Sequence, residues 1–504
     1  MASAREYHQR TKHSIASVQA DRHGLDWANQ PLPFKIYRGL APLSLPRGLA
    51  PGAVPALKAL ATCRGAGQAP IDQRELARLL HLSAGILRSR RYPNGQVMYF
   101  RAPACTGALY HIDLYLVCGE LPDLAAGVYH FGPHDFALRR LRDGDWRGAL
   151  VEASGGAPSL ATAPAVIVST STFWRNAWKY QARAYRHCYW DNGTMLAHLL
   201  ALAAADDVAA EVVLGFDDAA LNRLLGLDTE REVALSLVAL GRGAIPPDSA
   251  PEPPPLHEDS EPLSAAVVDY PLIRAAHAAT SLPSGAAARA WRAAGFGPTP
   301  VRPAAIAATP LRPPDPAPGA TIDDAIARRR SARRFARTAI DFDAFSSILR
   351  AATRGVPFDC NGADCASLVE PYVIVHAVDG LAPGAYAFDV ARAALEPLRH
   401  GDFRREAGML DLGQELAADA AANVYLLADL ARACATLGDR GYRAAQLEGG
   451  IVGGKLYLAA YALGLGATGL TFFDDEVTTF FSPHAAGKDV MFLVAIGNAA
   501  RASR

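Results

Sequence analysis

The sequence lacks several features that would indicate a special partner or location. Its 504 residues include 50 basic and 50 acidic side chains, so no net charge favours nucleic acid or an anionic membrane as a partner. No apolar run is long enough to span a bilayer, because the most apolar stretch, from Met195 to Ala205, is short and contains His198. The first residues are polar and show no signal-peptide core. We therefore predict a cytoplasmic protein.

Cysteine is also scarce. The seven cysteines include no Cys-x-x-Cys pair, so we expect reduced thiols, with neither a disulfide framework nor a metal site such as zinc. What is present is ordinary for a soluble globular protein, since half the residues are hydrophobic and a fifth are charged. The length alone predicts two to four domains.

The sequence repeats itself at a fixed interval. Gly384 lies 257 positions after Gly127, and the same offset relates further motifs in the two halves, namely Gly127-x-Tyr129-x-Phe131 to Gly384-x-Tyr386-x-Phe388, Tyr185-Arg186 to Tyr442-Arg443, and Phe216-Asp217-Asp218 to Phe473-Asp474-Asp475. Chance similarity does not keep one register over so long a span. The sequence therefore predicts a tandem duplication of one α+β unit.

We divide the chain accordingly into an N-terminal arm (1–54), a first unit (55–242), a proline-rich linker or wrapping segment (243–319) and a second unit (320–504). A duplicated unit commonly docks about a pseudo-two-fold axis, as a homodimer would. We expect such an intrachain dimer, with a higher oligomer left open; the alternative is two independent domains. We also expect a long buried helix near 183–205, interrupted by Gly193.

One short segment concentrates positive charge. Residues 328–335, Arg-Arg-Arg-Ser-Ala-Arg-Arg-Phe, place five arginines and a serine just after the proline-rich segment. Arginine presents a planar fork of donors that matches a phosphate dianion, and a serine hydroxyl adds a neutral hydrogen bond. An arginine run alone more often forms a solvated basic face. The other motifs of the chain favour the phosphate site.

These motifs resemble those of a known family. Arg329-x-Ser331-x-Arg333 is similar to the flavin-phosphate motif of nitroreductase-like flavoproteins. The segment from Ala104 to Val117 resembles the Pro-Ser-Ala-Gly-Ala-Leu-Tyr-Pro signature of one branch, the SagB/ThcOx-type dehydrogenases, which oxidise azolines in ribosomal peptides. The resemblance implies an α+β fold in which a mostly antiparallel sheet is flanked by helices. It also implies FMN at an interface to which both units contribute.

The resemblance allows two sites, of which the first is nearly complete. We call it the Arg329 site. The second half supplies its phosphate grip, Arg329, Ser331 and Arg333, and the turn Gly469-Leu470 that would face the flavin ring. The first half supplies its loop, Cys105, Thr106 and Gly107. Cysteine and threonine replace the serine and alanine of the family, but Gly107 still permits close backbone approach. Lys179 and Tyr180 match a Lys-Tyr pair of the azoline dehydrogenases.

The second site, which we call the Arg64 site, is degenerate in every part. Its grip reads Leu60-x-Thr62-x-Arg64, its turn is Val212-Val213, its loop is 361–364 with Asp364 near the expected anion, and Thr436-Leu437 replaces the Lys-Tyr pair. The intact parts are thus divided between the halves and meet only if the two units clasp each other. We infer one FMN site that is intact and one that is vestigial.

Lys179 and Tyr180 are the candidate catalytic residues. Their ordinary pKa values lie near 10, too high for a base at neutral pH. We expect burial to lower the pKa of Lys179, and Lys179, Arg175 or Arg183 to lower that of Tyr180. One of the pair would act as base and the other as orienting acid, and which is which stays open. The structural alternative is an interfacial lysine beside a packed tyrosine.

We therefore predict an FMN-dependent oxidoreductase that oxidises a heterocycle, azoline to azole, or a Cα–Cβ bond in a peptide-derived natural product. Its partners would be a peptide or small-molecule substrate and other biosynthetic enzymes. An NAD(P)H-dependent nitro- or quinone reductase is the first alternative. A non-catalytic scaffold in a peptide-maturation complex is the second, and the electron acceptor is left open.

Overall fold

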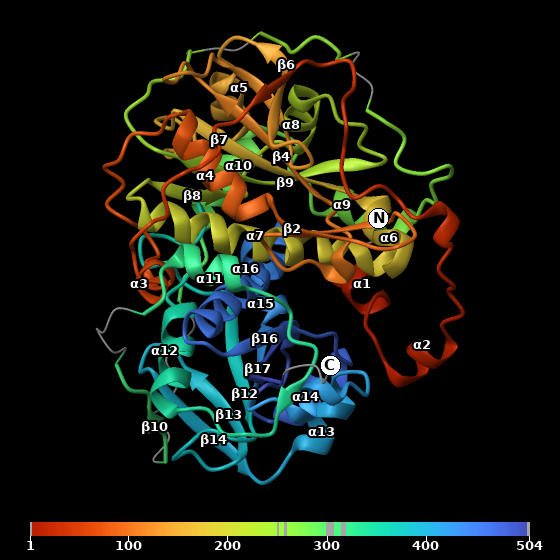
Figure 1. Ribbon diagram of the computed structural model, residues 1–504, viewed down its shortest axis with the longest axis vertical. Helices are drawn as coiled ribbons and strands as arrows, with labels where there is room; N and C mark the ends of the chain where they lie inside the picture. The colour runs from red at the N-terminus through yellow and green to blue at the C-terminus, as the bar shows by residue number, and fades with distance from the viewer. Residues whose placement is uncertain (1–2, 249–250, 257–259, 299–306, 314–318, 501–504) are drawn as a thin grey trace.

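Two halves of similar build lie one above the other in the computed structural model, which describes residues 3–248, 251–256, 260–298, 307–313 and 319–500 (Figure 1). The strands of the first half pair in the order β1-β6-β5-β4-β7-β9-β8, with every neighbouring pair antiparallel. These strands are β1 (Pro42–Ser44), β4 (Ile112–Cys118), β5 (Gly127–Gly132), β6 (Ala137–Asp143), β7 (Ala165–Thr172), β8 (Ala210–Val213) and β9 (Glu232–Leu240).

The sheet of the second half repeats this topology. Its order is β10-β14-β13-β12-β15-β17-β11, with β16 also paired to β17. The strands are β10 (Thr309–Pro310), β11 (Phe335–Ala336), β12 (Val369–Val375), β13 (Gly384–Asp389), β14 (Ala394–His400), β15 (Ala422–Ala428), β16 (Gly466–Gly469) and β17 (Asp489–Ala499). The predicted α+β duplication is confirmed, because each strand of the first sheet has a counterpart at the equivalent place in the second.

Helices cover the sheets and fill the space between the halves. In the first half they are α1 (Ala4–Arg10), α2 (Ile15–Ala20), α3 (Ala56–Ala61), α4 (Gln73–Ala84), α5 (Arg147–Ala153), α6 (Phe173–Tyr180), α7 (Ala184–Ala205) and α8 (Asp218–Leu225). In the rest of the chain they are α9 (Pro271–Ala279), α10 (Gly285–Ala294), α11 (Ile322–Arg328), α12 (Phe342–Ala352), α13 (Arg404–Leu410), α14 (Glu415–Asp419), α15 (Leu430–Leu437), α16 (Arg440–Ala462) and α17 (Asp474–Phe481). No helix of the described residues has the length and apolarity needed to cross a membrane.

Helices α7 and α16 pack against each other at the centre of the molecule, between the two sheets (Figure 1). A Cβ on Gly193 would lie 2.6 Å from backbone atoms of Gly450, so only glycine allows the helices to come this close. The expected interruption at Gly193 is wrong, because α7 continues through it. Glycine serves the contact between the two halves here.

Reciprocal ion pairs join the halves beside these helices. Asp474, in the second half, forms ion pairs with Arg183 (3.0 Å) and Arg186 of the first half. Asp218, in the first half, forms ion pairs with Arg440 (2.7 Å) and Arg443 of the second half. All six side chains are buried. Neighbouring guanidinium groups outweigh the cost of burial and hold the pKa values of both carboxyl groups far below the ordinary range.

The arm and the wrapping segment fill equivalent places. Arg186 donates hydrogen bonds to the backbone carbonyl of His8, in α1, and to the hydroxyl of Thr11, the C-cap of that helix. Arg443 makes the same two contacts in the other half, to the backbone carbonyl of His277, in α9, and to the hydroxyl of Thr280, its C-cap. Helices α1 and α9 therefore belong to the repeated pattern, although they lie in segments assigned to an arm and a linker.

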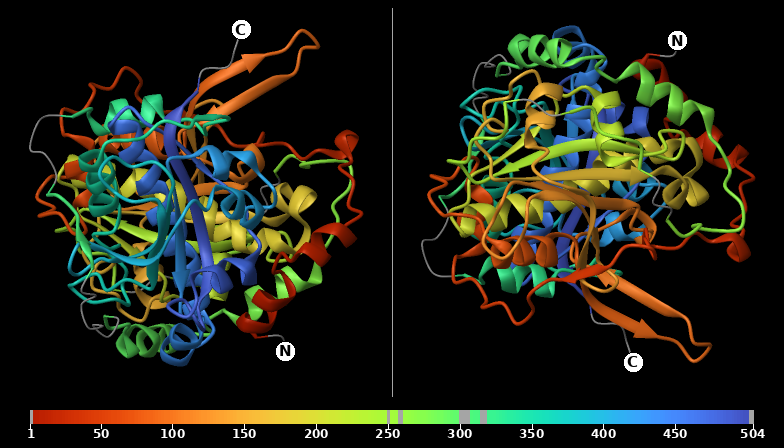
Figure 2. Two further views of the ribbon diagram at one scale, coloured as in Figure 1. Left: turned by 90° about the horizontal axis from the view of Figure 1, so that it is seen from below. Right: turned by 90° about the horizontal axis from the view of Figure 1, so that it is seen from above.

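The first half carries a hairpin that the second half lacks. Strands β2 (Ile86–Arg91) and β3 (Val97–Arg101) form a hairpin that projects from the body of the molecule (Figure 2). In the second half, α12 and β12 are joined by a shorter connection without a hairpin. The base of the hairpin lies beside the predicted phosphate grip of the other half, as described below.

Candidate functional site

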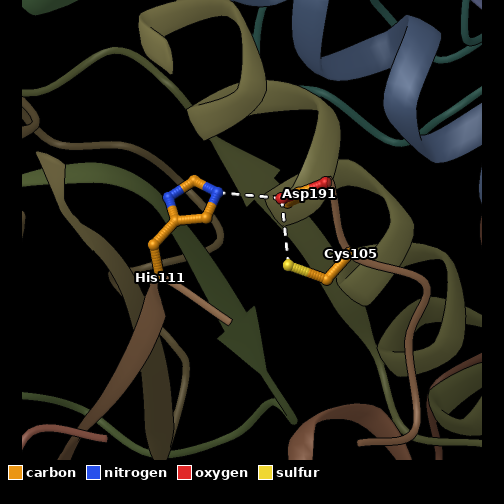
Figure 3. A group of neighbouring side chains, drawn as sticks. All are labelled: Cys105, His111 and Asp191. Carbon is orange, nitrogen blue, oxygen red and sulfur yellow. Dashed lines mark hydrogen bonds and ion pairs between the residues drawn. The ribbon is translucent and has the colours of Figure 1, made fainter. Parts of the chain in front are cut away.

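The loop Cys105–Gly107 is held by one carboxylate on the central helix α7. Asp191 accepts hydrogen bonds from the backbone N–H of Thr106 (2.9 and 3.0 Å to its two oxygens) and from the Thr106 hydroxyl (2.7 Å). The Cys105 thiol donates to the same carboxylate at 3.1 Å (Figure 3). Four donors thus converge on Asp191 when the imidazole of His111 at 2.8 Å is included. The sequence did not identify Asp191 or His111 as site residues.

Gly107 brings this loop against the end of helix α6. Its φ is +63°, a backbone conformation that favours glycine, and a Cβ there would lie 2.9 Å from the Tyr180 hydroxyl oxygen. The structure therefore places two predicted parts of the Arg329 site, the loop and Tyr180, in direct contact.

The Lys179-Tyr180 pair differs from expectation. Lys179 is exposed rather than buried, with its Nζ 5.3 Å from the centre of the Tyr180 ring. Burial, followed by the Asp191 carboxylate and the Cys105 thiol, raises the pKa of Tyr180. The expected lowering of that pKa is wrong. The arginines invoked for it are already paired, Arg175 with Asp113 at 2.8 Å and Arg183 with Asp474. Tyr180 is thus suited to donate a hydrogen bond.

Arg329, at the end of α11, is a buried cation of the second half that reaches the first. Its Nε donates to the carbonyl of Ala102 (3.0 Å) and its Nη2 to that of Arg101 (2.8 Å), at the base of the β2–β3 hairpin. None of the ion pairs among the described residues involves Arg329. Burial lowers the pKa of Arg329. Smaller electrostatic effects come from Tyr457, Tyr110 and Tyr461, which raise this pKa, and from Arg88, which lowers it. A buried guanidinium without a carboxylate fits an anionic ligand such as phosphate.

The remaining parts of the grip meet through a tyrosine. The Tyr457 hydroxyl lies 3.2 Å from Ser331 Oγ and accepts the backbone N–H of Gly469. A Cβ on Gly469 would meet no atom closer than 3.5 Å, and Leu470 packs on the segment that follows Ser331. Arg333 is exposed and takes no part in these contacts. Sequence reasoning missed Tyr457, since a tyrosine in an apolar helix resembles a core residue.

A row of rings links the two groups of residues. Tyr180 packs edge-on against His187 (4.6 Å between ring centres), which lies 4.9 Å from Trp190, which in turn lies 5.8 Å from Phe492. Phe492 is within 3.6 Å of the position that a Gly469 side chain would occupy. Packed rings therefore link the loop of one half to the grip of the other, and the donors at Arg329, Ser331 and Tyr457 have the chemistry to hold the phosphate of a flavin mononucleotide.

Cys105, His111 and Asp191 also place three possible metal ligands within 4.8 Å of one another. Their contacts, 2.8 Å from His111 to Asp191 and 3.1 Å from Cys105 to Asp191, are hydrogen-bond distances. Two ligands of a tetrahedral zinc ion, bound at 2.0–2.3 Å, stay roughly 3.3 Å or more apart. The cluster therefore has the geometry of a hydrogen-bond network.

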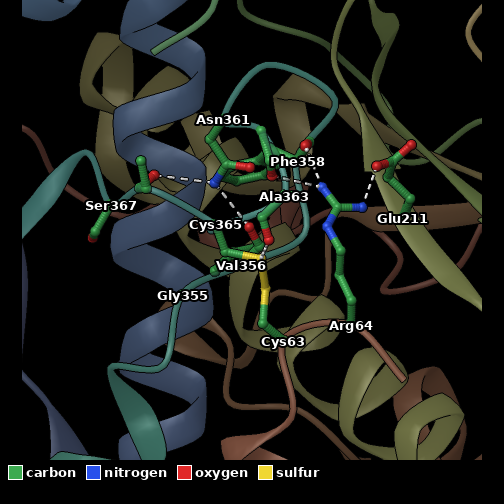
Figure 4. The surroundings of a disulfide bond; sticks show 12 residues. Cys63, Arg64, Glu211, Gly355, Val356, Phe358, Asn361, Ala363, Cys365 and Ser367 are labelled. Atoms are coloured by element: carbon green, nitrogen blue, oxygen red, sulfur yellow. Dashed lines mark hydrogen bonds and ion pairs between the residues drawn. A yellow bond between two sulfur atoms is a disulfide. The ribbon is translucent and has the colours of Figure 1, made fainter. Parts of the chain in front are cut away.

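The Arg64 site is closed by a covalent bond. Cys63, in the degenerate grip, forms a disulfide with Cys365, which directly follows the degenerate loop of the other half (Figure 4). The expectation that all seven cysteines are reduced is therefore wrong for these two. They are 302 residues apart, and only the docking of the halves brings them together.

The other groups of the Arg64 site are bonded to one another. The Arg64 guanidinium donates to the carbonyls of Phe358 (3.1 Å) and Gly362 (3.2 Å) and pairs with Glu211 (Figure 4). The backbone of Val212, at the counterpart of the flavin turn, pairs with residues 357–359 of the second half. Asp364 is exposed. A carboxylate beside the arginine and a loop over the turn do not fit a second flavin phosphate.

Comparison with known proteins identifies the repeated unit. The model of the Nitroreductase family matches residues 61–242 and again 326–498. A curated protein of Methanocaldococcus jannaschii, "Putative nitroreductase MJ1384", is 30% identical over 165 residues, which are 31% of this chain and 81% of that protein.

Among solved structures, a "putative nitroreductase" from Anabaena variabilis is similar over 99% of this chain and 100% of its own, with a TM-score of 0.75 and 27% identity. The E. coli microcin synthetase McbBCD complex, with truncated pro-MccB17 bound, contains a chain similar at 20% identity and a TM-score of 0.31, over 48% of this chain and 88% of its own. That weaker likeness supports no inference about the substrate of this chain.

Proposed function

The chain belongs to the nitroreductase family, and we propose from this premise that it is an FMN-dependent oxidoreductase with one flavin, held between its two halves at the Arg329 site. The observation that carries the proposal is the contrast in charge between the sites. Both arginines donate to backbone carbonyls, but Arg329 is buried and has no carboxylate partner among the described residues, whereas Arg64 is paired with Glu211. Members of this family are typically flavin-dependent.

Within this proposal the second half holds the phosphate. Arg329 supplies a charge-assisted hydrogen bond, Ser331 and Tyr457 supply hydroxyl groups, and Arg333 reaches from the surface. Gly469 and Leu470 would approach the ring of the cofactor from the second half, and Cys105, Thr106 and Gly107 would approach it from the first. FMN, when bound, supplies an acceptor for hydride.

Tyr180 and Lys179 are the proposed catalytic residues. Tyr180 keeps its proton at neutral pH because burial raises its pKa, so it orients the substrate as a hydrogen-bond donor. Lys179 is the other member of the proposed pair and lies at its exposed side, where its ammonium group would face a bound substrate. Neither role requires the Arg64 site.

The resemblance to the SagB/ThcOx branch supports a substrate class: an azoline, or a Cα–Cβ bond, in a peptide-derived natural product, with other biosynthetic enzymes as partners. A general NAD(P)H-dependent nitro- or quinone reductase shares the same family and fold. A non-catalytic scaffold is the third reading. We place the protein in the cytoplasm, where thiols are kept reduced, so the state of Cys63 and Cys365 depends on the redox conditions.

Colour and stoichiometry test the proposal. The purified protein should be yellow and release one FMN per chain on denaturation. Two FMN per chain would contradict the closed Arg64 site. A colourless protein that does not take up added FMN would favour the non-catalytic scaffold over both enzyme functions. Rapid bleaching of the bound flavin by NADPH would favour the general reductase over the azoline oxidase.

A further inference from the structure

A chain of buried polar side chains extends inward from the Cys105–Gly107 loop. His111 Nε2 lies 2.8 Å from Asp191 (Figure 3). On its other side, His111 Nδ1 lies 2.8 Å from Ser171 Oγ. The Cys188 thiol approaches Ser171 Oγ at 3.3 Å. His111, Ser171 and Cys188 are fully buried. Since Asp191 only accepts hydrogen bonds, His111 donates to it from Nε2.

The equivalent positions of the second half show what such a network is worth to the fold. Glu448, 257 positions after Asp191, accepts from Ser367 Oγ (2.7 Å) and from the backbone N–H of Leu368 (2.6 Å). Both halves thus carry a carboxylate at this place on the central helix. In the second half it bonds residues 367 and 368, the counterparts of 110 and 111, which follow the loop 361–364. A carboxylate at this position is therefore a property of the repeated unit.

The polar groups behind the carboxylate exist in one half only. Applying the same offset, the counterparts of the three buried groups are apolar: Leu368 for His111, Ala428 for Ser171 and Ala445 for Cys188. The fold of the unit therefore does not require a histidine, a serine or a cysteine at these places. Burying polar groups costs free energy unless function or bonding compensates it. The half that retains them contributes its loop to the Arg329 site.

We propose that His111 is a positioning residue of the Arg329 site: through Asp191 it fixes the Cys105–Gly107 loop in the form that receives the cofactor and seats Tyr180. Two hydrogen bonds hold the imidazole, one to Ser171 and one to Asp191, so the carboxylate cannot turn away from Thr106. Gly107 then stays in its left-handed conformation against the Tyr180 hydroxyl. This inference rests on the proposed function.

The test replaces these residues of the first half by the residue types of their counterparts in the second half. FMN is titrated into the apoprotein, and the dissociation constant, the visible absorption spectrum of bound FMN and the melting temperature are recorded. His111→Leu should weaken FMN binding by about tenfold or more and change the spectrum. Ser171→Ala should weaken it by a few fold. His111→Gln, which keeps a donor at the Nε2 position, should recover most of the affinity.

The matched control is Glu448→Gln, which changes the carboxylate at the position equivalent to Asp191 and weakens its bonds to Ser367 and Leu368. It should lower the melting temperature and leave FMN affinity unchanged. The proposal is overturned if His111→Leu binds FMN with wild-type affinity and spectrum, or if His111→Leu binds FMN more tightly than His111→Gln does. It is also overturned if Glu448→Gln weakens FMN binding as much as His111→Leu does. If His111→Leu does not fold, the FMN affinities of Ser171→Ala and His111→Gln test the proposal in its place. A wild-type chain that binds no FMN contradicts the proposed function, and this inference with it.

Discussion

The two interface sites of this molecule have the same ancestry and opposite contents. At the Arg329 site, a buried guanidinium with no carboxylate partner among the described residues, a glycine turn and a loop in contact with Tyr180 converge from the two halves. At the Arg64 site, the equivalent places hold a disulfide, an arginine paired with Glu211, and a loop that pairs with Val212. The charge of Arg329 is bonded to backbone carbonyls only, whereas the charge of Arg64 is neutralised by a carboxylate.

The difference shows how a duplicated unit can divide its tasks. In a homodimer, a substitution that closes one site also closes its twin, because symmetry repeats it. Fusion of the two copies removes this constraint. One interface can then serve the cofactor while the other fastens the halves by covalent and hydrogen bonds. Five predictions test this division.

The largest effect is expected at Tyr180. Tyr180→Phe removes the donor while keeping the ring, and should lower turnover of a thiazoline-containing model peptide by about 100-fold, at the low end of what a positioned acid contributes. Lys179→Ala should also give a coloured but slow protein. Thr436→Ala, at the position equivalent to Lys179 in the Arg64 site, is the matched control and should leave turnover unchanged. Equal loss in all three would show that the sites are not divided.

Arg329→Ala should weaken FMN binding by about tenfold to 100-fold, because a hydrogen bond to a charged group contributes about 1.5–3 kcal/mol. Titration of the apoprotein measures the dissociation constant. Arg333→Ala should have a smaller effect, since its side chain is exposed. Wild-type affinity in Arg329→Ala would place the phosphate elsewhere.

Reduction of the disulfide should loosen the halves without releasing FMN. Denaturant titrations with and without dithiothreitol should differ by about 2–4 kcal/mol in the free energy of unfolding, the range typical of a native disulfide. Cys63→Ser should reproduce the reduced value. In the denatured protein, five thiols should react before reduction and all seven after it. Seven thiols before reduction would show that the Arg64 site is not covalently closed.

Glu448 should make stability depend on pH. Burial raises its pKa from 4.5 to about 7, against the smaller effect of its hydrogen bonds to Ser367 and Leu368. Between these values the folded chain binds the proton more tightly than the unfolded chain does. The free energy of unfolding should therefore fall as pH rises from about 4.5 to 7, by up to about 1.4 kcal/mol per pH unit. Glu448→Gln should flatten this slope, and an unchanged slope would assign it to another group.

The smallest effect is expected from Arg64→Ala. Its guanidinium is partly exposed and bonded only to protein groups, so FMN affinity should not change and stability should fall by about 1 kcal/mol or less. The same FMN titration as for Arg329→Ala makes the comparison direct. Loss of colour in Arg64→Ala alone would reverse the assignment of the two sites.

Much of the fold was predictable because a repeat is a property of the sequence. The offset between Gly127 and Gly384 identified the two units, and the counterpart strands β5 and β13 begin at these residues. The pairing of intact and degenerate motifs also predicted which half supplies the grip and which the loop. Helix α10 and the repeated role of α1 and α9 were missed, because the proline-rich composition around α10 resembles a linker.

The environment of individual side chains was harder to predict. Trp178 is buried and Lys179, the next residue, is exposed, since successive residues of a helix point in different directions. The hydrogen bond between His111 and Asp191 joins residues 80 positions apart. No local pattern announces such a contact.

The sequence by itself determined the duplication, the α+β unit and the separation of the intact motifs, because these depend on residue type and spacing along the chain. The tertiary structure alone decided that Cys63 meets Cys365, that Arg329 is buried with no carboxylate partner in the described part of the chain, and that Asp191 holds the loop. These properties arise where the two halves dock. They follow from distances in space, which the order of residues does not contain.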